Sequence, residues 1–255
     1  MASSIFANGP TMRFSISTVS IYVRAVAAAC FLGALVQSAS AASIGVNFAT
    51  DGTGASFDLG PTDNTGVVPQ DHWNNAHNSD ATLSNLVDDL GNATGASITW
   101  GHSPISTNVA GGTPIGNLLH SAVIAGPADS IVVSNIPYST FDLYLYISAP
   151  NTSPTTVLFK INHGIDAGHQ LSVSGIADHS PNPVFVPSTL QNTGSYLFLG
   201  GVSGSTLYIG GSGGPVVDGL QIMEAPEPTS LALLVCAGLG LAAVCLRRRK
   251  TLGPF

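Results

Sequence analysis

Basic residues are almost absent from the central part of the chain. Between residues 42 and 225 the sequence holds one cation, Lys160, against thirteen Asp and Glu residues, which gives a net charge of −12 with histidine neutral. Nucleic-acid binding needs Lys and Arg to displace counterions from phosphates, and peripheral binding to anionic lipid needs the same residues. The composition therefore excludes both classes of function for the central region.

Cysteine is also scarce. The three cysteines, Cys30, Cys236 and Cys245, all lie in apolar segments near the two ends of the chain. The central region has none, which excludes disulfides and cysteine-based metal sites there. A domain of roughly 150 residues does not depend on disulfides, because it already buries about 70% of the surface of its unfolded chain.

The first 41 residues have the order of a secretory signal peptide. Arg13 and Arg24 supply a positive flank, residues 25–36 form an uninterrupted apolar run, and Ala39 and Ala41 are small residues at the positions read by signal peptidase. We predict a signal peptide over residues 1–41 that signal peptidase removes after Ala41. The alternative is an uncleaved anchor, for which the apolar run is short.

The C-terminal end contains three consecutive signals. Ala225-Pro226-Glu227-Pro228 is followed by an uncharged stretch over 229–246 and then by Arg247-Arg248-Arg249-Lys250. As a helix, 229–246 would extend about 27 Å at roughly 1.5 Å per residue, close to the ~30 Å hydrocarbon core. The cations would stay in the cytoplasm with the short tail 251–255 and place the central region outside. A plain single-pass anchor is the alternative to a sorting signal.

This tripartite order resembles the PEP-CTERM sorting signal of Gram-negative bacteria. The resemblance implies recognition by an exosortase, a membrane cysteine transpeptidase, with cleavage near Pro226 to Pro228. It also implies a host that makes exopolysaccharide, and a protein held briefly in the membrane before it reaches the cell surface or the extracellular matrix. We assign residues 225–250 to this signal. Its motif residues are Pro226, Glu227, Pro228, Arg247, Arg248 and Arg249.

Residues 42–224 show the pattern of an all-β ectodomain. Short runs with alternating apolar residues are separated by Gly, Pro, Asn, Asp and Ser, which predicts an antiparallel β-sandwich. The clearest alternation puts Phe141, Leu143, Leu145 and Ile147 on one face, which should be the core face. Helices are expected only over 83–90 and 117–124. The expected strands are 44–49, 96–100, 130–134, 140–148, 155–162, 170–174, 183–186, 195–199, 206–209 and 216–223.

The ends of this domain resemble the galactose-binding-like and malectin-like jelly rolls. The residues that carry the resemblance are 44–48, the Asp-Gly-apolar run 217–222, Tyr144 and Tyr146. In those folds the first and last strands pair, and the usual role of the family is carbohydrate binding. The resemblance therefore implies a jelly-roll-like sandwich that binds a glycan.

Two groups of residues are candidates for a ligand site. In Trp73-Asn74-Asn75 an indole ring stands beside amides, and a sugar site needs a ring for the C–H face and amides for the hydroxyls. Tyr144 and Tyr146 project from one strand face and could form an aromatic platform. The alternatives are that Trp73 plugs one end of the sandwich and that the tyrosines are buried under a loop.

Metal binding and catalysis have little support in the sequence. Asp58, Asp63 and Asn64, with Asp51 nearby, could supply oxygen ligands for Ca²⁺, but they lack EF-hand spacing and are also typical of solvated turns. The sequence has no Gly-x-Ser-x-Gly nucleophile elbow. We predict no metal site, no other cofactor and no enzymatic activity. We predict a non-catalytic surface or matrix protein associated with glycan or exopolysaccharide. The alternatives are a purely structural or adhesive matrix protein and, with less support, a polysaccharide hydrolase.

Overall fold

The computed structural model describes ten segments of the chain. They are residues 42–49, 57–77, 82–102, 104–107, 109–126, 131–149, 153–163, 170–181, 184–212 and 216–225. All of them belong to one compact unit that begins at Ala41. The predicted signal peptide, the predicted span 229–246 and the sorting motif from Pro226 onward lie outside the described residues. Within the ten segments, no helix has the length and apolar character needed to cross a membrane.

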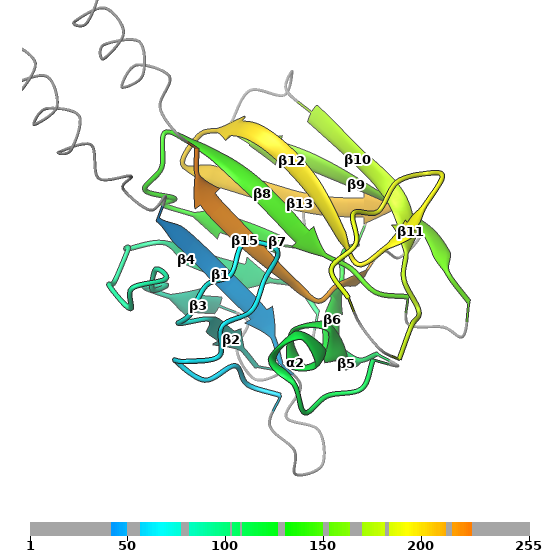
Figure 1. Ribbon diagram of the computed structural model, residues 1–255. Helices are drawn as coiled ribbons and strands as arrows, with labels where there is room; N and C mark the ends of the chain where they lie inside the picture. The colour runs from blue at the N-terminus through cyan, green and yellow to red at the C-terminus, as the bar shows by residue number, and fades with distance from the viewer. Residues whose placement is uncertain are drawn as a thin grey trace, which may run out of the picture. The chain divides into compact units, whose positions relative to one another are not determined.

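A five-stranded sheet forms one layer of this unit (Figure 1). All neighbouring pairs are antiparallel except β1 and β2, which run parallel. In spatial order the strands are β12 (Tyr196–Ser203), β8 (Thr140–Tyr146), β15 (Gly219–Glu224), β1 (Ser43–Phe48) and β2 (Asn74–Ala76).

A seven-stranded sheet forms the second layer, and a small third sheet lies beside the single helix of the described residues, α2 (Pro114–His120). The seven strands, in spatial order, are β11 (Thr193–Gly194), β10 (Gln170–Ala177), β9 (Thr155–His163), β13 (Thr206–Ser212), β7 (Ile131–Ser134), β4 (Ser97–Trp100) and β3 (Thr82–Ser84). The third sheet contains β14 (Val216–Val217), β6 (Ser121–Ile124) and β5 (Ile105–Ser106).

One hydrophobic core joins the two large sheets. Leu143 of β8 and Leu220 of β15 belong to the same buried cluster as Val133 of β7 and Phe159 of β9. Two antiparallel-rich sheets that share one core make the arrangement of a β-sandwich. The predicted all-β class is therefore confirmed.

The alternation in β8 fixes which side of its sheet faces this core. Phe141, Leu143 and Leu145 are completely or almost completely buried, and Ile147 just beyond the strand is buried with them. Successive side chains of a strand point to opposite faces, so Asp142, Tyr144 and Tyr146 lie on the outer face. The predicted core face of this strand is confirmed.

The first and last strands of the domain pair with each other. Val46 of β1 lies opposite Leu220 of β15 in an antiparallel ladder that runs from Ser43 to Asn47. This pairing brings the two ends of the described chain together in the middle of the five-stranded sheet. It was expected from the resemblance of residues 44–48 and 217–222 to jelly-roll ends.

The helix predicted over 83–90 is wrong. The chain instead forms the short strand β3 and then a turn in which Asn85 and Gly91 both have φ near +60 to +80°. The Asp88 carboxylate accepts hydrogen bonds from the Leu90 and Asn92 backbone N–H groups and closes this turn. Asp side chains compete in this way with helical hydrogen bonding.

The second predicted helix, 117–124, is displaced toward the N-terminus. Thr113 caps α2 by accepting a hydrogen bond from the Gly116 N–H at 3.1 Å, and Pro114 occupies the first turn, where its missing N–H is tolerated. The chain leaves the helix after His120 and enters β6, so 121–124 is a strand. The strand predicted over 183–186 is also not formed at 184–186, which is an irregular segment.

Candidate functional site

Trp73 and Tyr146, two of the predicted ligand-binding residues, lie in the interior. The Trp73 side chain is 5% exposed and Tyr146 is 0% exposed. Their rings meet edge to face with centroids 5.9 Å apart, in a second hydrophobic cluster on the outer face of the five-stranded sheet. The indole Nε1–H donates to the Gln70 carbonyl at 3.2 Å. The indole therefore closes the outer face of the sheet and is not displayed to solvent.

A buried hydrogen-bond network surrounds the Tyr146 hydroxyl. The hydroxyl accepts from the Val67 N–H at 2.8 Å and donates to Gln221 Oε1 at 2.9 Å. Gln221 Nε2 then donates to the Val68 carbonyl and to Gln70 Oε1, each at 2.8 Å. Burial raises the pKa of Tyr146 well above its ordinary value, so the phenol stays neutral and keeps its proton for Gln221. This network fastens the segment that contains Val67 and Gln70 to the sheet.

Asn74 bridges two parts of the backbone. Its Nδ2 donates to the Gly45 and Val87 carbonyls at 2.8 and 2.9 Å, and its Oδ1 accepts from the Val87 N–H at 2.8 Å. These bonds connect β2 to β1 and to the turn that follows β3. The Asn74 amide groups are therefore engaged with the protein's own backbone.

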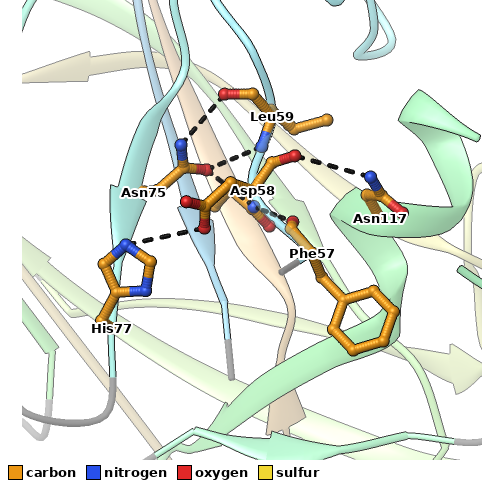
Figure 2. A network of polar contacts seen from close by, with 7 residues as sticks. Phe57, Asp58, Leu59, Asn75, His77 and Asn117 are labelled. Carbon is orange, nitrogen blue, oxygen red and sulfur yellow. Dashed lines mark hydrogen bonds and ion pairs between the residues drawn. The ribbon is translucent and has the colours of Figure 1, made fainter. Parts of the chain in front are cut away.

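Asn75 has a similar arrangement, shown in Figure 2. Its Oδ1 accepts from the Leu59 N–H and from Asn47 Nδ2, and its Nδ2 donates to the Leu59 carbonyl, all at 2.9 to 3.0 Å. In the same figure His77 Nε2 lies 3.5 Å from the Asp58 carboxylate, and Asn117 reaches toward the Asp58 carbonyl from α2. The segment around Asp58 is thereby tied to β1, β2 and α2. A sugar-binding role for Trp73, Asn74 and Asn75 stays a prediction.

The carboxylates considered as Ca²⁺ ligands, Asp58 and Asp63, each contact a different nearby group of the protein. Asp63 Oδ2 accepts from the Gly60 N–H at 2.7 Å and closes a turn, and Asp58 faces His77. Asp51 lies outside the described residues. Among the residues that are described, no three His, Cys, Asp or Glu side chains are grouped so that they could hold a metal ion.

Three neighbouring aromatic residues on the outer face are at least partly accessible to solvent: Tyr144, Tyr196 and Phe198, which we call the aromatic surface. Phe198 lies directly opposite Tyr144 across the β12–β8 ladder, and their ring centroids are 5.0 Å apart. Tyr196 lies 6.0 Å from Tyr144. Phe198 is 49% exposed, and the two tyrosines are partly buried. Of the predicted tyrosine pair, only Tyr144 therefore reaches solvent, and its partners come from β12.

The sequence contained a signal for these two additional residues. In Tyr196-Leu197-Phe198-Leu199 the aromatic residues alternate with leucines, and Leu197 is buried in the core. Period-two alternation of this kind places Tyr196 and Phe198 on one face of a strand. Their position beside Tyr144 depends on β12 pairing with β8, which the run alone does not specify.

A carboxylate lies at one end of the aromatic surface. Asp142 projects from β8 on the same face as Tyr144, and its Oδ1 accepts from the Gly201 N–H at 2.9 Å. The ladder shifts register between Leu199 and Val202, and Gly201 has a φ of +70°. Burial, and secondarily the charge of Asp142, raises the pKa of Tyr144. The ring next to Asp142 is therefore a neutral phenol at ordinary pH.

The comparisons with known proteins concern the C-terminal signal. Residues 224–250 match the family model of the PEP-CTERM protein-sorting motif, which confirms the resemblance drawn from the tripartite order. No curated protein and no solved structure matches the chain. The described part of the molecule is thus a mostly β domain, and the chain carries a PEP-CTERM sorting motif. That motif supports an exported protein that an exosortase processes at the membrane or the cell surface.

Proposed function

We propose that this protein is an exported cell-surface or extracellular-matrix protein of a Gram-negative bacterium whose jelly-roll-like domain binds glycan through the aromatic surface. Signal peptidase removes residues 1–41, and the helix 229–246 anchors the chain in the membrane until exosortase acts near Pro226 to Pro228. The released domain then associates with exopolysaccharide. The sorting motif supports export, and the aromatic surface supports glycan binding.

The aromatic surface supports glycan binding because of its composition and its place. Phe198, Tyr144 and Tyr196 form a contiguous group on the accessible part of the outer sheet face, and the pairing of β12 with β8 fixes their spacing. Apolar C–H faces of pyranose rings stack on such rings, while tyrosine hydroxyls bond to sugar hydroxyls. Because the Tyr144 ring already packs against the other two, less side-chain freedom is lost on binding.

A matched set of variants tests the glycan part. Tyr196→Ala and Phe198→Ala each remove one ring of the aromatic surface, whereas Tyr208→Ala removes a similarly half-buried ring from the outer face of the seven-stranded sheet. The full chain, purified in non-ionic detergent, is screened on a glycan array and then titrated with the polysaccharides that bind. We expect at least tenfold weaker binding for the first two variants, about 1.4 kcal/mol, and an unchanged affinity for the control.

Two results would count against this part of the proposal. One is the absence of any glycan ligand, and the other is equal binding by all variants. Thermal unfolding of each variant confirms that a lost affinity is not a lost fold. If the protein binds no glycan but self-associates in analytical ultracentrifugation, a structural or adhesive matrix role replaces the proposal.

Cell fractionation tests the export part. We expect the wild-type chain outside the cytoplasm in a form shortened at both ends. Replacing Pro226, Glu227 and Pro228 by alanine should leave a longer form in the membrane, because exosortase no longer recognises it. Mass spectrometry of the C-terminal peptide distinguishes the two forms. Full-length, unprocessed protein soluble in the cytosol would contradict export.

A further inference from the structure

The charge around the aromatic surface is negative. Asp142 Oδ1 and the Phe198 ring border the same residue: a Cβ placed on Gly200 would lie 3.1 Å from Phe198 Cζ and 3.3 Å from Asp142 Oδ1. Asp142 also follows the alternation that puts Tyr144 on the outer face. A chain stacked on Phe198 therefore passes next to a carboxylate.

Among the described residues, no Lys or Arg lies on this side of the domain. The one Lys or Arg between residues 42 and 225 is Lys160. It is exposed on β9, between Phe159 and Ile161, which both point into the core. Lys160 therefore lies on the outer face of the seven-stranded sheet, with the core between it and the five-stranded sheet. It cannot pair with a ligand on the aromatic surface.

These charges bear on the kind of polysaccharide that fits. A polyuronate carries one carboxylate per sugar, so it would bring like charges to Asp142, and no Lys or Arg of the described residues lies on this face to neutralise them. Like charges held close together at a protein surface repel each other, and they do so more strongly than in bulk water. The hydroxyls of an uncharged sugar can instead donate to the Asp142 carboxylate, and charge-assisted bonds of that kind are the stronger ones.

Resting on the proposed function, we infer that the aromatic surface binds an uncharged polysaccharide and rejects polyanionic ones. Aromatic stacking supplies the affinity, and Asp142 supplies the discrimination between neutral and acidic chains. The protein would then hold the neutral glycans of a surface matrix and leave the acidic polymers unbound.

Paired polymers test this inference on the full chain in non-ionic detergent. The probes are a soluble neutral β-glucan and a polygalacturonate of similar length, each titrated at about 20 mM and about 500 mM salt. We expect glucan affinity to change less than twofold with salt, because no charge is paired. Polygalacturonate should bind at least tenfold more weakly than glucan at low salt, where charges are least screened.

Asp142→Asn isolates the contribution of the carboxylate. The asparagine Oδ1 can still accept from the Gly201 N–H, so the loop contact is kept while the charge is removed. We expect polygalacturonate binding to strengthen at least threefold at low salt, with this gain absent at high salt. Lys160→Gln is the charge control on the opposite face and should leave the preference for glucan unchanged.

The failures of the two proposals can be told apart. Polygalacturonate that binds as tightly as glucan at low salt, and loses affinity in Phe198→Ala, would overturn the inference and leave the glycan-binding surface standing. Binding of neither polymer, or glucan binding that Phe198→Ala does not change, would overturn the surface itself. An Asp142→Asn variant with unaltered polymer preference would refute the role of the carboxylate.

Discussion

The buried hydroxyl of Tyr146 should contribute far more to stability than the hydroxyl of Tyr144, two residues away on the same strand face. Tyr146→Phe removes the acceptor of the Val67 N–H and the donor to Gln221 Oε1, while the ring stays in place. Gln221 is completely buried, so its oxygen is left without a partner from Tyr146 in the interior. A buried polar group left unsatisfied costs about 1–3 kcal/mol.

The expected loss for Tyr146→Phe is therefore about 2–4 kcal/mol of the free energy of unfolding, because two polar groups lose a partner. Tyr144→Phe makes the same chemical change on a partly exposed ring and should cost less than about 0.5 kcal/mol. Urea unfolding with linear extrapolation measures both differences. Equal losses for the two variants would refute the idea that the network over Tyr146 holds the outer-face segment.

Two further substitutions probe the interior. Burial raises the pKa of Asp218 well above its ordinary value of 3.8. The folded protein therefore keeps a proton that the unfolded chain releases. As a result, the free energy of unfolding falls by about 1.4 kcal/mol per pH unit from about pH 4 up to the native pKa. In the wild type the Ser148 hydroxyl donates to Asp218 Oδ1 at 2.7 Å, and Asp218→Asn can keep this acceptor. The variant cannot titrate, so its free energy of unfolding relative to wild type should rise with pH in chemical denaturation from pH 4 to 8. Gly45→Ala should cost about 1–3 kcal/mol in urea unfolding, because the new Cβ would overlap the Gln70 amide and lie 2.7 Å from the Trp73 ring.

Each of these substitutions has a contrary outcome. A constant stability difference between Asp218→Asn and wild type across that pH range would mean that the carboxyl is not held protonated in the folded state. A neutral Gly45→Ala would mean that the segment over β1 adjusts without loss. Gly126→Ala is a control for the glycine case, since its φ is not positive and a Cβ there would lie no closer than 3.7 Å to another atom, His102 Nε2.

Local patterns in the sequence were sufficient to predict most of the longer strands and the core face of β8, but not the short strands β2, β3, β5, β6 and β11. Phe141, Leu143 and Leu145 alternate with less apolar residues, and a strand that pairs on both edges can satisfy this alternation only by burying that face. The all-β class follows from many such runs. The helix over 83–90 was predicted wrongly because its leucine spacing also suits a strand followed by a turn that Asp88 closes.

The candidate site was harder to predict because the outer face of the five-stranded sheet is covered over only part of its area. Tyr144 and Tyr146 are two residues apart in β8, so the alternation of side chains predicts the same face, and the same exposure, for both. Tyr146 is buried because the segment around Val67 folds over it, and Tyr144 remains accessible because that cover ends before it. The predicted sugar site at Trp73 depended on an exposed ring, which the same cover buries.

The sorting motif, the segregation of basic residues to the two ends and the lack of cysteine in the central region are properties of the linear chain. Enzymes of export read such signals as short peptides, so the amino-acid order is sufficient to predict them. The burial of Trp73 and the grouping of Tyr144 with Phe198 arise from contacts between distant residues, since Gln221 meets Val68 across 153 positions and Tyr146 across 75. Contacts over such separations depend on how the strands pair and which segment covers the sheet, and for that reason only the folded molecule reveals the surface to which a ligand has access.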